Sequence, residues 1–287
     1  AQAPRRARIP WLRRRGGRAA CPQPWHRYRN EGDAPYIQRG MQTFDAEVQP
    51  ISTNRPRDIR TAGKFIRKAF IRKVYGVLTI QLLVTTVVSA YIYTNAQTGD
   101  WLRSHEWLLW VSVAATLSSI CVMTCCAELC RTYPTNYMFL FAFTTFEAIM
   151  IGFVSAIFTW ESLLLAAGIS VLVFVGLTIY AFNSEVDFTG LWPYLFAALM
   201  AVGVFGLVLA VLPAFGLHVE MLTALYDLIG VVLFAFYIIF DTQLMLGEYG
   251  GHRLSLSIDD YVFAALNLYM DIINLFLHIL SLLGERR

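Results

Sequence analysis

Basic residues almost disappear from this chain after residue 73. Of its 23 lysines and arginines, 18 lie within residues 1–73, whereas residues 74–287 carry 5 bases and 15 of the 20 acids. A segment with this charge attracts cations and repels anions. We therefore expect cations and protons as its partners, and no nucleic acid.

The sequence also lacks the short motifs that mark soluble enzymes. It has no phosphate-binding P-loop, no H-E-x-x-H zinc motif and no G-x-S-x-G nucleophile motif, and its five histidines show no metal-ligand spacing. We therefore expect neither an enzyme nor a bound cofactor.

Five cysteines provide no disulfide framework, because four of them crowd one apolar stretch at Cys121, Cys125, Cys126 and Cys130. On a helix, spacings of four residues would form two pairs that could bind a metal. Cysteine is also a small apolar residue that membrane helices tolerate, and we prefer that interpretation, with palmitoylation of Cys130 as a further alternative.

Long apolar segments dominate the rest of the chain. Hydrophobic residues make up 57% of the sequence and charged residues 15%, whereas roughly 25% of the residues in soluble domains are charged. From residue 75 onward, apolar runs long enough to cross a bilayer alternate with short polar loops, so neighbouring helices should be antiparallel. We predict an all-α integral membrane protein with a seven-helix transmembrane bundle over residues 64–287. The predicted spans are 75–93, 107–126, 137–158, 162–182, 191–212, 221–246 and 261–283.

Residues 1–63 differ from the bundle in composition. Nine arginines and several prolines lie within the first thirty residues, with no acid before Glu31, so this segment is predicted to be a disordered, Arg-rich cytosolic tail. A composition rich in arginine and poor in acids is also typical of mitochondrial transit peptides, but here prolines interrupt the segment. Met41 is an alternative start, which leaves open whether residues 1–40 belong to the native protein.

A cluster of bases just before the first span sets the predicted orientation. Six lysines and arginines lie between Arg60 and Lys73, and the positive-inside rule keeps such a cluster in the cytosol. Seven crossings would then place the C-terminus on the other side, although residues 284–287 (GERR) are mildly basic. The last span therefore either crosses fully or re-enters the membrane.

Carboxylates occur inside the predicted spans, where a charge costs about 2.5 to 3.5 kcal/mol on insertion scales. Glu147 lies near the middle of the third span, Asp241 lies in the cytosolic half of the sixth, and Asp271 lies ten residues into the seventh. Because an acid kept at such a cost marks a functional site, we predict that these residues belong to an ion path. Asp227 lies nearer the end of the sixth span, and we interpret it as an interfacial residue.

Four polar residues form a stripe along the seventh span. Asn267, Asp271, Asn274 and His278 are spaced by 4, 3 and 4 residues, which places them on one helical face. Lipid cannot satisfy such a stripe, so this face must contact protein or water, and we expect it to line the path. Asn267 and His278 could equally bond neighbouring helices together. A weaker stripe on the first span is interpreted as helix packing and consists of Gln81, Thr85 and Ser89.

Asp241 and Asp271 flank the predicted cytosolic loop 247–260, so two antiparallel helices can bring their carboxyl groups together. Two acids in contact inside a membrane cannot both ionise cheaply, and such a pair shares a proton near neutral pH. When ionised, the same oxygens suit Ca²⁺. We therefore predict a pH sensor and gate at which protons and transiently bound Ca²⁺ compete.

Two further points concern this aspartate pair. Arg131 is a base near the inner ends of the second and third spans, and it is a candidate latch that would pair with a carboxylate and hold the path shut. Paired helix aspartates are also the hallmark of intramembrane proteases, but the glycine-rich flanks of those sites are absent around Asp241 and Asp271. We therefore set proteolysis aside.

Two stretches around these aspartates carry a family resemblance. Residues 239–245 have the sequence IFDTQLM, and residues 261–276 have the sequence YVFAALNLYMDIINLF. Shorter matches precede the first, third and fifth spans at 70–75 (FIRKVY), 133–136 (YPTN) and 187–189 (DFT). With these motifs the sequence resembles the transmembrane Bax-inhibitor-motif family, on its lifeguard branch, over residues 64–287.

The resemblance implies a fold in which six helices surround the last, and a pH-sensitive Ca²⁺ leak that lowers the content of intracellular stores and protects against apoptosis. It assigns the sensor to Asp241 and Asp271 and the latch to Arg131, although the run of bases in some members is reduced here to one. The expected location is the ER, the Golgi or another endomembrane, with the plasma membrane as an alternative. Two other functions stay open: a non-conducting regulator that binds apoptosis proteins or Ca²⁺-channel subunits, and a cation/proton exchanger.

Overall fold

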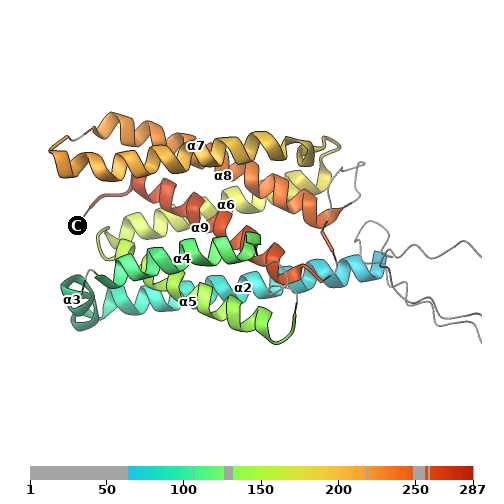
Figure 1. Ribbon diagram of the computed structural model, residues 1–287, viewed down its shortest axis with the longest axis horizontal. Coiled ribbons are helices and arrows are strands. Elements are labelled where there is room, and N and C mark those ends of the chain that lie inside the picture. Colours follow the sequence, from blue (N-terminus) through green and yellow to red (C-terminus); the bar gives the residue numbers. More distant parts are fainter. Residues whose placement is uncertain are drawn as a thin grey trace, which may run out of the picture. The chain divides into compact units, whose positions relative to one another are not determined.

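The computed structural model describes residues 64–105, 107–125, 132–217, 219–247, 256–257 and 259–286. The predicted tail, residues 1–63, lies outside the described residues. Helices make up almost all of the described chain, as the apolar runs predict (Figure 1). In chain order they are α2 (Lys64–Thr94), α3 (Ala96–Ser104), α4 (Trp107–Cys125), α5 (Thr135–Ser155), α6 (Trp160–Asn183), α7 (Trp192–Val211), α8 (Glu220–Leu246) and α9 (Tyr261–Leu283). The 3₁₀ turns Phe188–Leu191 and Leu212–Phe215 precede and follow α7.

Six of these helices have the length and apolarity needed to cross a bilayer, namely α2, α5, α6, α7, α8 and α9. A span needs about 20 residues, and α9 is one unbroken helix of 23 residues, without the break that a re-entrant segment would need. α4 takes the place of the second predicted span, and its described apolar stretch is the shorter Trp107–Ser119. The prediction of an α-helical, multi-pass membrane protein is therefore confirmed.

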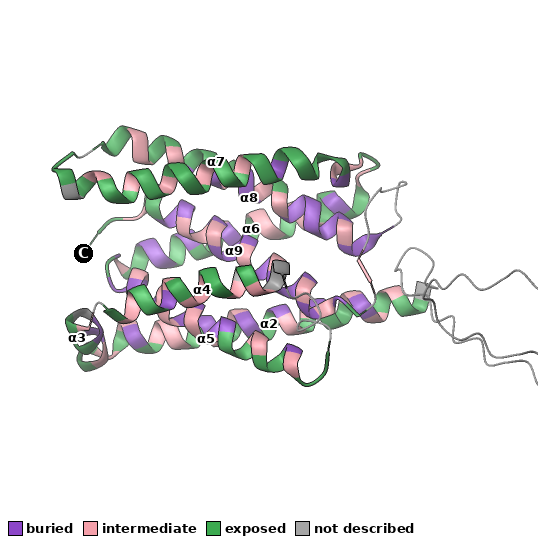
Figure 2. Ribbon diagram, viewed as in Figure 1, coloured by how far each residue is buried: buried purple, intermediate pink, exposed green. Residues whose placement is uncertain are grey.

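Helices α7 and α9 differ sharply in how they are covered. α9 packs against α2, α5, α6 and α8, and 61% of its apolar stretch is buried, compared with 6% for the segment that contains α7. Figure 2 shows the same contrast, with buried residues concentrated on α9 and exposed residues on α7. The polar stripe of α9 explains the difference, because polar side chains must find partners inside the bundle, whereas the uniformly apolar α7 can face lipid.

Two features of the chain path differ from the prediction. The nine-residue helix α3 was not predicted, and it is capped by Asn95, whose side chain accepts a hydrogen bond of 3.2 Å from the Thr98 N–H. The third span ends at Ser155 instead of residue 158, because the chain turns there and meets the C-terminal segment. At that turn the Thr159 N–H donates to the Glu285 carbonyl at 3.0 Å.

The helices run between two ends of the bundle, which we name for what they carry. The basic end is where α2 begins, with exposed Lys68 and Arg72, and the C-terminal end is where α9 finishes at Leu283. α8 runs from the C-terminal end to the basic end, and α9 returns (Figure 1).

Polar side chains of α2 join it to its neighbours. Gln81 Nε2 donates to Thr144 Oγ1 on α5 at 3.1 Å, and the hydroxyl groups of Thr85 and Tyr269 on α9 lie 2.7 Å apart. Both α2 residues are buried. Their interpretation as helix-packing residues is confirmed.

Candidate ion-binding site

Asp241 on α8 and Asp271 on α9 meet inside the bundle. They are 7% and 5% exposed, and their carboxyl groups lie close enough to interact directly. A carboxylate only accepts hydrogen bonds, so a hydrogen bond between the two groups requires a proton on one of them. The arrangement therefore suits a proton shared between two antiparallel membrane helices.

One oxygen of the aspartate pair has no donor. Asp271 Oδ2 is buried and receives no hydrogen bond from the residues that the structure describes. Those residues also provide no lysine or arginine partner for either carboxyl group, and the Tyr237 phenol lies within electrostatic range of both. Such an oxygen can accept a proton or a cation. Ca²⁺ takes about six to eight oxygens, so water or carbonyl groups would have to complete its shell beyond these two side chains.

Gln243 anchors the end of α8 that carries Asp241. Its side chain is fully buried; Oε1 accepts a hydrogen bond of 2.8 Å from the Phe188 N–H, and Nε2 donates to the Val186 carbonyl at 2.8 Å. These bonds fix the last turn of α8 to the segment between α6 and α7. The position of Asp241 along the bundle is thereby set by backbone groups and not by side-chain packing alone.

Tyr261 anchors the first turn of α9 at the same end of the bundle. Its hydroxyl accepts a hydrogen bond of 2.9 Å from Asn136 Nδ2 on α5, and Lys73 Nζ on α2 lies 3.4 Å from its ring centroid. A cation over an aromatic face is attracted by the ring quadrupole. Three helices therefore meet around the residue that begins α9, ten positions before Asp271.

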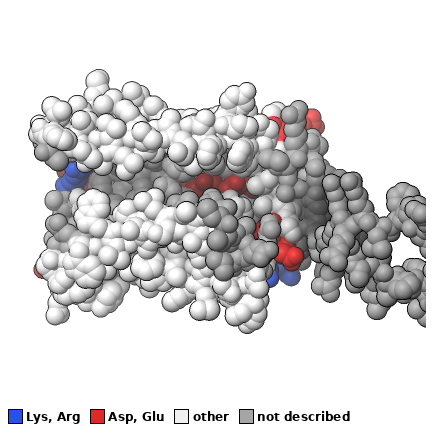
Figure 3. All heavy atoms as spheres, in the orientation of Figure 1, with Lys and Arg blue, Asp and Glu red and all other residues white. Residues whose placement is uncertain are grey.

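Glu147 on α5 lines a second polar location, a cavity of about 240 Å³ between α4, α5 and α9. Its side chain is 4% exposed and lies close to Thr116 on α4. Asn274 lines the same cavity and donates its amide to the Met270 carbonyl on its own helix at 2.8 Å. The space can hold several water molecules. Figure 3 shows acidic atoms inside the hollow between α7 and α8 on one side and α4 and α5 on the other.

His278 is paired with Asp227 and not with the aspartate pair. His278 Nδ1 lies 2.9 Å from Asp227 Oδ1, and the Ser281 hydroxyl donates to the other carboxyl oxygen. Asp227 is 4% exposed, and its interpretation as a residue at the depth of the membrane interface stays a prediction. A histidine and a serine on α9 supply the hydrogen-bond partners that offset the free-energy cost of burying this carboxyl group.

The remaining member of the stripe, Asn267, is half-buried one turn before Asp271. The four stripe residues thus share a helical face but meet different surroundings. Asp271 contacts Asp241, Asn274 lines the cavity with Glu147, and His278 bonds to Asp227.

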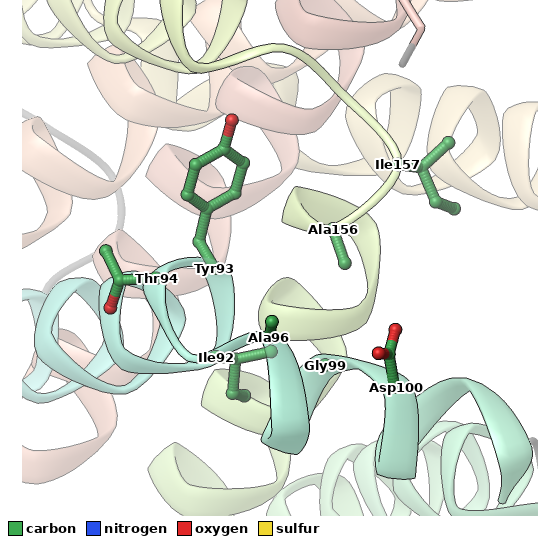
Figure 4. Close-up of a pocket in the computed structure, with 8 residues that line it drawn as sticks. All are labelled: Ile92, Tyr93, Thr94, Ala96, Gly99, Asp100, Ala156 and Ile157. Atoms are coloured by element: carbon green, nitrogen blue, oxygen red, sulfur yellow. The ribbon is translucent and has the colours of Figure 1, made fainter.

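A larger cavity of about 680 Å³ lies away from these acids, toward the C-terminal end. The end of α2, the start of α3 and residues 156–157 line it, with Asp100 as the acid in its lining (Figure 4). This cavity was not predicted, because α3 forms one of its walls and was itself not predicted.

Comparison with known proteins decides the family. The model of a family described as inhibitor of apoptosis-promoting Bax1 matches residues 67–287. The chain belongs to this Bax-inhibitor family. Bax inhibitor 1 of Schizosaccharomyces pombe is 33% identical over 226 residues, which are 79% of this chain and 80% of that protein.

Two relatives carry the lifeguard name. Human Protein lifeguard 3 is 31% identical over 221 residues, covering 77% of this chain and 70% of that protein. Mouse Protein lifeguard 4 is 36% identical over 225 residues, covering 78% of this chain and 88% of that protein. The resemblance drawn from the motifs is confirmed.

The Bax-inhibitor match begins within α2 and extends through α9, so it contains every acid described above. Arg131, Cys126 and Cys130 lie outside the described residues, which leaves the latch and the cysteine group as predictions. Cys121 is exposed. The bonding of Asp227 to His278 was missed in the sequence, although both residues are polar positions inside apolar spans.

Proposed function

We propose that this chain is a pH-sensitive Ca²⁺ leak channel of an intracellular membrane, which modulates stored Ca²⁺ and inhibits apoptosis. The buried and closely placed carboxyl groups of Asp241 and Asp271 carry the proposal. A shared proton bonds α8 to α9, and its loss replaces that bond by repulsion between two carboxylates at short distance. Protonation therefore changes the contact between α8 and α9 from repulsive to attractive. When both carboxyl groups are ionised, the pair becomes a cation site.

The path would run along the polar stripe of α9. Glu147 and Asn274 line a cavity there, and Asn267 continues the stripe beyond Asp271 toward the basic end. Carboxylates that line a membrane path select cations over anions. The scarcity of bases after residue 73 supports the same selectivity.

The proposed topology has seven crossings, with α4 as the second and α9 in the centre. The contacts of α9 with four other helices support its central place, and the antiparallel order of the helices supports a crossing by α4. By the positive-inside rule, the bases at the start of α2 favour a cytosolic location for the basic end and for the aspartate pair. An endomembrane is the proposed location.

A second candidate is a non-conducting regulator that acts through apoptosis proteins or Ca²⁺-channel subunits. The names of the family and of one relative favour it, because the family is described as an inhibitor of apoptosis-promoting Bax1 and the relative is named Bax inhibitor 1. A protein that inhibits by binding needs no ion path. The buried, hydrogen-bonded acids are the feature that it leaves unexplained.

One pair of measurements separates the two candidates. Purified protein in liposomes should pass Ca²⁺, and the double variant Asp241→Asn/Asp271→Asn should lose the pH dependence of that flux. The same variant should also lose protection against apoptosis in cells at matched expression. Absence of Ca²⁺ flux at every pH would reject the channel, and protection that survives the double substitution would favour the regulator.

A further inference from the structure

Asp227, His278 and Ser281 form a polar cluster that is separate from the aspartate pair. Asp227 lies in the second turn of α8 and Ser281 in the last turn of α9, so the cluster lies near the C-terminal end, whereas Asp241 is five residues from the other end of α8. Both Asp227 and His278 are buried, and Ser281 is exposed. The cluster therefore connects a buried imidazole to the surface at the C-terminal end.

The packing around His278 leaves one ring nitrogen free of side chains from α8. Nδ1 is bonded to Asp227, and Nε2 faces residue 230, which is a glycine. A Cβ atom at that position would lie 2.4 Å from Nε2, so every other residue would collide with the ring. Phe234 stacks on the imidazole with ring centroids 5.7 Å apart, and Tyr226 meets it edge-on at 5.2 Å. The ring is thus held in place, with Nε2 packed close to the main chain of Gly230.

Few titratable groups face the imidazole from the helices packed around it. α8 contributes Asp227 and the Tyr226 phenol. From α2, Tyr93 packs against the apolar cluster around Leu275 and Ile279, and from α5 Glu147 shares its cavity with Asn274, one turn before His278. The buried positions of α6 contain no titratable residue; they are Ser162, Leu163, Ala166, Ser170 and Ala181.

Exposed charged residues at the C-terminal end of the bundle include Glu161, Glu220, Glu285 and Arg286. Asp227 is therefore the charged partner that the structure gives to His278. A neutral imidazole donates Nδ1–H to the carboxylate and can accept a second proton at Nε2, which leaves a buried ion pair instead of a buried single charge. Either state keeps the bond to Asp227.

We propose that Asp227 and His278 form a second proton-binding site of the α8–α9 pair, loaded from the C-terminal end. The aspartate pair would respond to the compartment at the basic end, and the Asp227–His278 site to the compartment on the other side. Because both sites lie between α8 and α9, a change of protonation at either site would change the contact between these two helices. The expected effect on Ca²⁺ flux rests on the proposed leak function. The expected binding of a proton at this site is independent of that function.

The first test measures proton binding without any flux. The full-length protein in nanodiscs is labelled at its histidine rings, and the resonance that disappears in His278→Gln is assigned to His278. We expect this resonance to change when the pH is varied, and we expect Asp227→Asn to alter that change while Asp271→Asn leaves it as in the wild type. A His278 resonance that does not change with pH would overturn the proposal.

The second test measures Ca²⁺ flux in liposomes of known protein orientation, with the pH set separately on each side. We expect His278→Gln to lose the response to pH at the C-terminal end and to keep the response at the basic end. His105→Gln is the matched control, because His105, the C-cap residue of α3, is a partly exposed histidine near the same end. An unchanged two-sided response in His278→Gln would overturn the coupling to flux. Complete absence of flux would reject the proposed leak, and the titration would still decide the proton site.

Discussion

The side-chain oxygen of Gln243 accepts a hydrogen bond of 2.8 Å from the backbone N–H of Phe188. Gln243 is two residues beyond Asp241, and its amide also donates to the Val186 carbonyl. A buried glutamine thus satisfies one donor and one acceptor of the chain between α6 and α7. In this way the family motif around Asp241 includes both the acid and the residue that fixes its helix.

Replacement of Gln243 by leucine should lower the free energy of unfolding by about 2 to 4 kcal/mol, because two buried backbone groups lose their partners. Denaturant titration in detergent micelles measures this change. The control is Gln97→Ala on α3, where the side chain is exposed and we expect a change within about 0.5 kcal/mol. Equal stability of the Gln243 and Gln97 variants would show that the contact contributes nothing.

Thr85 offers a sharper comparison, because its neighbour Thr86 is a natural control. Thr85 is buried and bonded to Tyr269, whereas Thr86 is exposed and bonded to the carbonyl of Leu82 on its own helix. Thr85→Val should cost about 1 to 2 kcal/mol of unfolding free energy, the range of hydrogen bonds between membrane helices. Thr86→Val should be close to neutral. Denaturant titration in detergent micelles measures both changes. A larger loss of unfolding free energy in Thr86→Val than in Thr85→Val would contradict the contact between Thr85 and Tyr269.

The sequence predicts the transmembrane helices well, because each long apolar run has one physical explanation. It predicts α3 poorly, since nine mixed residues between two spans carry no such pattern, and the capping role of Asn95 is visible only in the structure. The contact between Asp241 and Asp271 was expected from two helices joined by a short loop. The contact between Asp227 and His278 was not expected. It depends on how α8 and α9 are rotated about their axes, and the spacing of apolar residues in these two spans does not determine that rotation.

Substitution of Glu147 tests whether this buried acid serves the ion path or only the stability of the fold. Glu147→Gln keeps the shape of the side chain and removes its charge, so the free energy of unfolding should be unchanged or raised by up to about 1 kcal/mol. If Glu147 lines the path, Ca²⁺ flux in liposomes should fall at least threefold, on the order of 0.7 kcal/mol in barrier height. Glu185→Gln, at an exposed position after α6, is the control and should leave flux unchanged. Wild-type flux in the Glu147 variant would remove this residue from the path.

Competition between protons and Ca²⁺ at the aspartate pair should appear in thermal stability. Ionised carboxylates bind Ca²⁺ and protonated ones do not, so the stabilisation by Ca²⁺ should be present at high pH and disappear as the pH falls. At a concentration ten times the dissociation constant, Ca²⁺ should raise the unfolding midpoint by about 3 °C at about pH 8 and by nothing measurable at about pH 5. Asp241→Asn should abolish the shift, and Asp259→Asn, at an exposed acid before α9, should keep it. A shift that is equal at both pH values would contradict competition at the pair.

The central claim is that the Asp241–Asp271 pair senses pH, and Ca²⁺ flux against pH tests it most directly. Flux into liposomes is measured from about pH 5 to about pH 8 for the wild type and for Asp271→Asn, which keeps the size of the side chain and removes the shared proton. The account predicts that wild-type flux changes severalfold over this range and that the flux of the variant is the same at every pH. A variant with the wild-type pH profile would contradict it.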